Sequence, residues 1–400
     1  MDFSSDMVFR NGMGKPIPYR MYKKGVSAPM KEYDRRQLKA MCFVASLAPV
    51  TRLLPKATAQ IAGSASWLAP LCALPMLLLY LLVLTALMNM RREGEGLGEV
   101  VMRRAGRTAG SIGLGLIAVF QLFSAGFILR TGAHRLLSTI YPAAGPWFFM
   151  ATMLLMGTLA ALGPVKALPR ASRVFAPILL TVMLLALLLS LDSVDAKNLL
   201  PVTKTDFGKL FLSSLAVVEI YGGVLYCAAL LEDRAPLQGR RFASHAGRLA
   251  LICVLLTFFC AVIIGCYGAG LVARFSHPFF STVRDVTLMK TIERIEALVA
   301  ALWVLSDFVI FSLLLCCAAH ILRLIFGFIP EKTDARMLDM SNGRSLILIC
   351  AVLSAAAAAL IPSNEAALLG ISQIIVPGAS LVIIFVILPA LLLISRLRRP

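Results

Sequence analysis

Residues 212–231 read LSSLAVVEIYGGVLYCAALL, a membrane-length apolar stretch that is interrupted by Glu219 and then by Tyr221, Gly222 and Gly223. A carboxylate at bilayer depth is costly, so it normally faces a protein interior or a water-filled cavity. A glycine pair beside it lets the backbone leave the helix, which a membrane tolerates only where protein or water covers the break. Because broken helices of this kind form solute and ion sites in secondary transporters, we predict a small-solute site here.

The composition of the whole chain agrees with a membrane protein. Of the 400 residues, 59% are hydrophobic and only 15% are charged, and the mean hydropathy is +0.84. A soluble domain of this length does not have such a composition, whereas an all-α integral membrane protein with about ten spans does.

The basic excess follows the predicted topology. The net charge is +18, and most of the 39 Lys and Arg residues fall in alternate loops and in the two tails. This bias places both termini in the cytoplasm and faces the excess charge toward anionic lipid rather than nucleic acid. We expect residues 1–37 to form a basic cytoplasmic tail and residues 38–400 to form one membrane domain.

Several classes of site are not indicated by the sequence. The nine Cys residues lie in apolar stretches without metal-ligand spacing, so neither a disulfide framework nor a zinc site is predicted. Phosphate-binding and hydrolase motifs are also absent. We therefore expect no enzyme activity, no catalytic residue, no metal and no cofactor.

Hydrophobic runs divide the chain into ten predicted helical spans, and the order of these spans suggests a repeat. The spans cover about 38–62, 67–90, 108–138, 146–163, 174–191, 209–231, 247–272, 291–322, 344–361 and 370–395. In inverted-repeat transporters the first helix of each half is discontinuous. Here those helices would be span one, which Pro49 and Pro55 interrupt, and span six, which carries Glu219.

The candidate site residues in span six each have a structural alternative. Glu219 is either a ligand-binding or proton-carrying group, or a structural carboxylate that pairs with an arginine. Tyr221, Gly222 and Gly223 either form an unwound segment that receives a ligand carboxylate, or a close helix-packing surface.

The remaining candidates lie in spans one and eight. Arg52 could bind a ligand carboxylate or pair with Glu219, and Ser46 and Thr51 could offer hydroxyl groups. Asp307 lies deep in span eight and needs an interior partner.

Four segments carry a pattern that is familiar from one protein family. The most specific begins at Thr291 and carries Glu293, Arg294, Glu296 and Trp303, and weaker ones cover 55–68, 97–107 and 198–202. Together these segments resemble the spore-germination permease family, the membrane B subunits of germinant receptors. The family belongs to the amino acid–polyamine–organocation superfamily, so the resemblance implies a LeuT-type fold of two inverted five-helix repeats, with helices one and six discontinuous.

The resemblance also implies function and partners. It implies that an amino acid or similar nutrient binds between spans one, three, six and eight. It further implies an A-type membrane subunit and a C-type lipoprotein subunit as partners, in the inner membrane of a bacterial spore or cell. Two alternatives stay open, namely a proton-coupled amino acid transporter and a structural subunit in which Arg52 fills a degenerate site.

Overall fold

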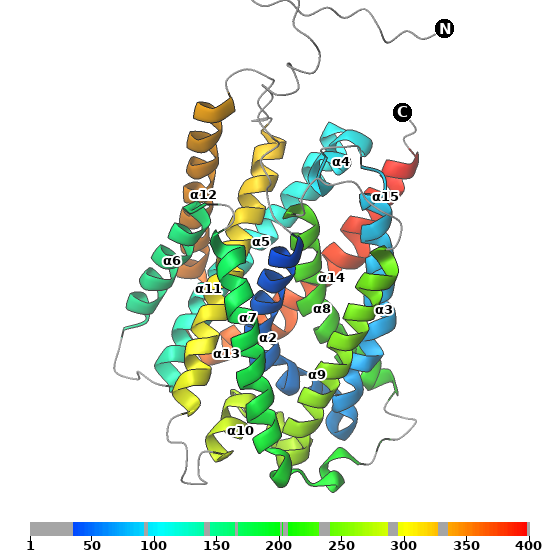
Figure 1. The fold of residues 1–400 in the computed structure, drawn as a ribbon, viewed down its shortest axis with the longest axis vertical. Coiled ribbons are helices and arrows are strands. Elements are labelled where there is room, and N and C mark those ends of the chain that lie inside the picture. Colours follow the sequence, from blue (N-terminus) through cyan, green and yellow to red (C-terminus); the bar gives the residue numbers. More distant parts are fainter. Residues whose placement is uncertain are drawn as a thin grey trace, which may run out of the picture.

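The protein forms one bundle of helices that run roughly parallel (Figure 1). The structure, a computed structural model, describes residues 35–91, 95–139, 145–164, 167–200, 202, 207–231, 241–286, 295–326 and 335–397. No strand occurs in this part of the chain. The prediction of an all-α fold is therefore confirmed.

The long helices follow the order of the predicted spans. They are α2 (Arg35–Ala62), α3 (Ala69–Met88), α5 (Arg107–Thr139), α6 (Pro146–Leu162), α7 (Ala167–Leu189), α8 (Phe207–Leu231), α9 (Arg241–Val272), α11 (Ile295–Ile325), α12 (Ala335–Leu360) and a continuous run of α13 (Glu365–Gly370), η6 (Ile371–Ile375), α14 (Val376–Val382), η7 (Ile383–Ile387) and α15 (Leu388–Leu397). Within the described ranges, eight stretches are long and apolar enough to cross a bilayer, and Leu38–Leu47 and Pro146–Leu162 are shorter apolar helices.

Short elements close the two ends of the bundle. Figure 1 shows α4 and the end of α15 at one end and α10 at the other. These short elements are η1 (Gly63–Leu68), α4 (Leu97–Arg104), η2 (Leu191–Ser193), η3 (Ala196–Leu199) and α10 (Pro278–Val286).

The packing of the helices repeats between the two halves of the chain. The first set of long helices is α2, α3, α5, α6 and α7, and the second set is α8, α9, α11, α12 and the C-terminal run. Helix α3 of the first set packs against α8, just as its counterpart α9 packs against α2. Helix α5 packs against α12, just as its counterpart α11 packs against α6. Likewise α2 contacts α7, and α8 contacts α14. Exchanging the first set of long helices with the second thus reproduces the pattern of neighbours, as a two-repeat transporter fold requires.

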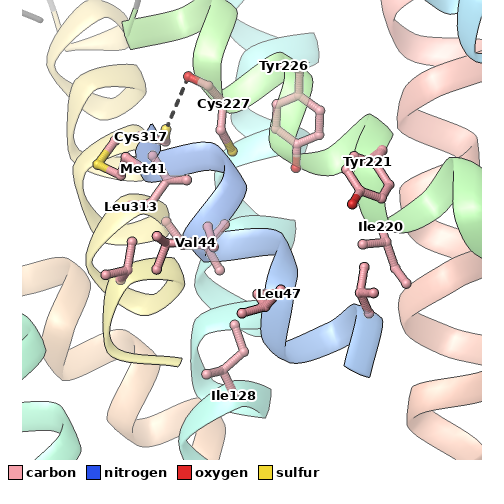
Figure 2. Close-up of a cluster of buried hydrophobic side chains, with 14 of the residues drawn as sticks. Met41, Val44, Leu47, Ile128, Ile220, Tyr221, Tyr226, Cys227, Leu313 and Cys317 are labelled. Carbon is pink, nitrogen blue, oxygen red and sulfur yellow. Dashed lines mark hydrogen bonds between the residues drawn. The ribbon is translucent and has the colours of Figure 1, made fainter. Parts of the chain in front are cut away.

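Helix α2 lies at the centre of this arrangement. It packs against α7, α8, α9 and α11. Figure 2 shows its side chains Met41 and Val44 toward α11 and Leu47 toward Ile128 of α5. Val44 and Leu54 are fully buried. Because protein surrounds α2, its polar side chains face other helices or cavities rather than lipid.

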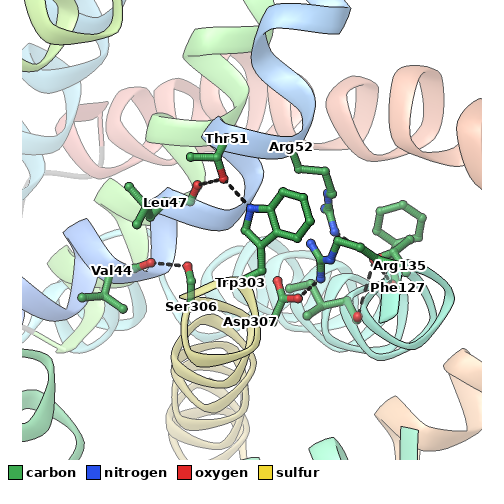
Figure 3. A network of polar contacts seen from close by, with 11 residues as sticks. Val44, Leu47, Thr51, Arg52, Phe127, Arg135, Trp303, Ser306 and Asp307 are labelled. Carbon is green, nitrogen blue, oxygen red and sulfur yellow. Dashed lines mark hydrogen bonds and ion pairs between the residues drawn. The ribbon is translucent and has the colours of Figure 1, made fainter. Parts of the chain in front are cut away.

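The predicted discontinuity of helices one and six is wrong. Helix α8 is a single α-helix from Phe207 to Leu231 that passes through Gly222 and Gly223 without a break. Helix α2 is also helical from Arg35 to Ala62, and it only changes direction below Leu47 (Figures 2 and 3). An unbroken helix keeps its backbone groups paired, which a membrane favours.

The first glycine of the pair in α8, Gly222, serves close packing instead. A Cβ atom on Gly222 would lie 2.3 Å from Cδ1 of Ile384, and the Tyr80 hydroxyl donates to the Gly222 carbonyl across 3.3 Å. The absence of a side chain therefore lets the C-terminal helical run approach α8. This was the structural alternative for the pair, and it holds at Gly222, whereas a Cβ atom on Gly223 would meet only Ser380 Oγ at 4.0 Å.

Irregular backbone is found in the C-terminal run. Two π-helical turns, η6 and η7, each end two residues before a proline, Pro377 or Pro389. A proline has no amide hydrogen and its ring clashes with the carbonyl four residues earlier, at Gln373 or Phe385. The helix widens over those carbonyls, and such π turns are frequent at functional sites.

A second irregularity lies in α9. Gly268 has φ 71° and ψ 151°, which interrupts the helix. Just before this break, the Gly265 carbonyl accepts hydrogen bonds from the Asn198 side chain at 2.7 Å and from the Asp195 amide at 3.1 Å. The η2–η3 segment is thereby fastened to the end of α9.

We predict that Gly126→Ala destabilises the protein. A Cβ atom at Gly126 would lie 2.6 Å from the Ser354 carbonyl oxygen and 2.9 Å from the Ala358 amide nitrogen, both backbone atoms of α12. Overpacking of this kind costs about 1–3 kcal/mol. Gly115→Ala on the same helix is the matched control, since its Cβ would meet only Ile325 Cδ1 at 3.8 Å. Thermal unfolding in detergent should show a clear loss for Gly126→Ala alone, and equal behaviour of the two variants would contradict this packing.

Candidate functional site

A cavity of about 100 Å³ lies between α2, α5, α8, α11 and the C-terminal run. We call it the central cavity. These helices include those between which the family resemblance places a ligand. The polar residues that line this cavity are Arg52, Ser124, Glu219, Asp307, Ser372 and Ser380.

A second cavity, of about 160 Å³, lies beside the first. We call it the basic cavity, because the charged or titratable residues that line it are Arg52, Lys56, His134, Arg135 and His277. Arg52, Leu53, Phe127 and Ser372 line both cavities and therefore form the wall between them. The η6 turn contributes Ser372 to this wall.

Arg52 is a buried cation without a carboxylate partner in the part of the chain that the structure describes. Its side chain is 7% exposed, and its Nη1 donates to the Thr131 hydroxyl across 3.3 Å. Its Nε has no hydrogen-bond partner. A buried charge is normally paired or fully hydrogen-bonded, so this guanidinium retains unused binding capacity.

Glu219 lines the same central cavity from α8. Its side chain is half-buried, and the ion pairs among the described residues do not include a pair between Glu219 and Arg52. Ser380 donates to the Glu219 backbone carbonyl across 3.4 Å, which holds α14 against α8. The predicted alternative of an Arg52–Glu219 pair is therefore not present.

Asp307 pairs with Arg135 instead. Arg135 Nη2 donates to Asp307 Oδ2, and each side chain is 3% exposed (Figure 3). Helix α5 thus directs Arg135 into the bundle, where Asp307 neutralises it.

Trp303 connects this pair to α2. Its Nε1 donates to the Thr51 hydroxyl across 2.9 Å, and its ring lies 5.1 Å from the Arg135 guanidinium carbon. On the same helix, the Ser306 hydroxyl donates to the Val44 carbonyl (Figure 3). These contacts fix α11 against α2 and α5 beside the wall between the cavities.

Of the other candidate residues of the sequence analysis, some line the central cavity and the rest contact neighbouring parts of the protein. Thr51 and Ser46 donate to carbonyls of their own helix, at Leu47 (2.8 Å) and Phe43 (2.8 Å). Gly223 lines the central cavity, whereas Ser46, Thr51, Tyr221 and Gly222 line neither cavity.

The family signature is only partly described. Glu293 and Arg294 lie outside the described residues, and the side chain of Glu296 does too. Trp303 is described and takes the position given above.

Sequence reasoning missed several residues of the two cavities. Lys56 and Arg135 were not among the candidates, and Ser124, Ser372 and Ser380 gave no signal because hydroxyl residues are common in membrane helices. Pro377 was an available signal, since a proline within an apolar helix marks disturbed backbone nearby.

His277 reports the positive character of the basic cavity. It lies between α9 and α10, outside the candidate membrane spans, and its ring is 5.3 Å from that of Trp303. Burial lowers the pKa of His277 to about 3, and the positive charges of Arg135, Arg52, Lys56 and His134 contribute to the shift. The ring is therefore neutral near pH 7.

We predict that acidification destabilises the protein through His277. An unfolded histidine has a pKa of about 6.5, so between about pH 3 and 6.5 the unfolded state binds more protons and stability falls as pH falls. At pH 5 this loss should be on the order of 1 kcal/mol. Unfolding of His277→Gln, compared with the unsubstituted protein at pH 7.5 and pH 5, should show a smaller loss at pH 5. An identical loss in both would contradict a neutral His277.

Comparisons with known proteins agree with this geometry. The family model described as "Spore germination protein" matches residues 34–366, and no curated protein matches the sequence.

Two solved structures share the fold at low sequence identity. A Na+-coupled sialic acid symporter in a substrate-bound, outward-open state is 12% identical, with a TM-score of 0.59 over 89% of this chain and 80% of that chain. The nucleobase-cation-symport-1 family transporter Mhp1, in a closed conformation with bromovinylhydantoin bound, is 14% identical, with a TM-score of 0.58 over 82% of this chain and 74% of that chain. The LeuT-type transporter fold is thereby shown, and because the family model covers most of the chain, the protein belongs to the spore germination permease family.

Proposed function

We propose that this chain is the nutrient-binding membrane subunit of a spore germinant receptor and that it binds a small zwitterionic amino acid in the central cavity. The observation that carries the proposal is that Arg52 and Glu219 line one cavity and are not paired with each other. Opposite charges held apart in one cavity match the two charges of an amino acid.

Each charge has a suitable partner on such a ligand. A guanidinium binds a carboxylate through forked hydrogen bonds, and Glu219 would accept hydrogen bonds from the ligand ammonium group. A ligand that satisfies both charges removes the cost of burying Arg52 without a counter-charge. The small volume of the cavity favours an amino acid with a short side chain.

Binding at this position would connect the two halves of the fold. Arg52 belongs to the first set of helices and Glu219 to the second, so a ligand between them favours the conformation in which both charges reach it. A ligand shifts a conformational equilibrium only through such differential binding. This is how nutrient binding would produce a signal.

The signal would pass to other subunits. We propose an A-type membrane subunit and a C-type lipoprotein subunit as partners, within the inner membrane of a bacterial spore or cell, with both termini of this chain in the cytoplasm.

A second candidate function is proton-coupled amino acid transport. It is favoured by the two adjacent cavities, which share a wall of only four residues, and by a fold that symporters also have. Glu219 would then carry the proton. Uptake of radiolabelled alanine into proteoliposomes distinguishes the two functions, because saturable uptake that Glu219→Gln abolishes would contradict a receptor without transport.

We predict that Arg52→Gln and Glu219→Gln each weaken amino acid binding about 10- to 100-fold, because each removes a charged hydrogen-bonding partner. Binding of L-alanine and other small neutral amino acids to the purified protein can be measured by ligand-dependent thermal stabilisation. Glu95→Gln is the matched control, since Glu95 lines neither cavity and pairs with Arg103 at 2.6 Å. Absence of stabilisation by every small amino acid, or equal weakening by Glu95→Gln, would contradict the proposed site.

A further inference from the structure

All the charged residues that line the basic cavity are positive. Arg52, Lys56 and Arg135 carry its positive charges, and none of its lining residues is an Asp or Glu. All three residues are buried, with Arg52 and Lys56 each 7% exposed as whole residues. Clustered buried cations repel one another, so the cavity is favourable for an anion.

The charge of the cavity is only partly neutralised within the protein. Asp307 pairs with Arg135 from the side of the central cavity. Arg52 has no such pair, and its buried Nε is without a hydrogen-bond partner among the described residues. At least one buried guanidinium therefore has donors available to an occupant.

His277 adds a neutral polar group to this lining. Burial is the main cause that lowers its pKa, and the charges of Arg135, Arg52 and Lys56 lower it further, so the ring adds no positive charge of its own. Its buried Nδ1 also has no partner in the described part of the chain. A neutral imidazole can donate one hydrogen bond to an anion without adding a further charge.

We propose that the basic cavity is a second binding site, which shares Arg52 with the central cavity, and that it takes a small organic carboxylate. The proposal rests on the lining of the basic cavity alone and does not require that an amino acid binds beside Glu219.

The donors around the cavity determine the class of ligand. Arg52 offers planar forked donors that match a carboxylate, and Lys56 offers a compact positive charge. Thr131 and Gln373 provide polar groups that can bind further oxygen atoms. An ammonium group finds no acidic partner in this lining, so the cavity should discriminate against amines and in favour of carboxylates.

Propionate is a suitable probe because it has a carboxylate and no amine. Thermal unfolding of the full chain in detergent would be followed during titration with sodium propionate, with sodium chloride at equal ionic strength and with propionamide, the neutral analogue. We expect propionate alone to raise the unfolding temperature in a saturable manner. Equal stabilisation by chloride or by propionamide would overturn the proposal, and this comparison needs no variant.

Variants assign the effect to the basic cavity. Lys56 lines the basic cavity and not the central cavity, so Lys56→Gln should weaken propionate binding at least tenfold and Lys56→Arg should largely preserve it. Lys209→Gln is the matched control, because Lys209 is exposed at the start of α8. If Lys209→Gln weakens binding as much as Lys56→Gln, the effect is a distant charge effect and the site is not in this cavity.

Glu219→Gln separates this inference from the proposed function. Removal of the Glu219 carboxylate should weaken binding of alanine and change propionate binding little. A propionate in the central cavity would lie beside the like charge of Glu219, so a marked gain in propionate affinity in Glu219→Gln would place the carboxylate there and overturn a second site. Propionate binding without alanine binding would instead contradict the proposed function while the second site stands.

Discussion

A guanidinium buried in the middle of a membrane-spanning bundle must find a counter-charge, and Arg52 finds none among the described residues of its own chain. It extends from the bend of α2 into the wall between two cavities and uses one of its donors on Thr131. The missing counter-charge of Arg52 determines the electrostatic character of both cavities. It makes the central cavity complementary to a carboxylate and gives the basic cavity its excess positive charge.

The surrounding network keeps Arg52 in this state. Asp307 forms an ion pair with Arg135, so its carboxylate does not pair with Arg52. Trp303 bonds to Thr51, the residue before Arg52, and thereby fixes α2 against α11. Glu219 lines the central cavity from α8 and does not form an ion pair with Arg52. The three helices are held together by contacts that leave one positive and one negative group for a ligand.

The sequence was sufficient for the fold class and for the choice of charged residues that lie inside the bundle. Apolar runs of membrane length located the spans, because a bilayer imposes a length and an apolar composition on every helix that crosses it. Arg52, Glu219 and Asp307 could be selected because a charge at that depth is rare. Two of the segments that resemble the family, 55–68 and 198–202, are in contact in the structure, because Trp67 donates to the Leu199 carbonyl across 3.3 Å.

Partners and backbone continuity could not be predicted in the same way. A Gly-Gly pair permits either a break or a close helix contact, and only the position of Ile384 decides for contact at Gly222. The pairing of Arg135 with Asp307 depends on the rotation of α5 about its axis, which one sequence does not specify. The π turns arise from prolines, but prolines in α2 produce only a bend, so the surrounding helices decide the outcome.

The most direct test is an experimental structure of the purified protein in saturating L-alanine, determined by cryo-electron microscopy. We predict density for the amino acid in the central cavity, with its carboxylate on Arg52 and its ammonium group toward Glu219. An empty cavity, with Arg52 and Glu219 joined in a direct ion pair, would contradict the account.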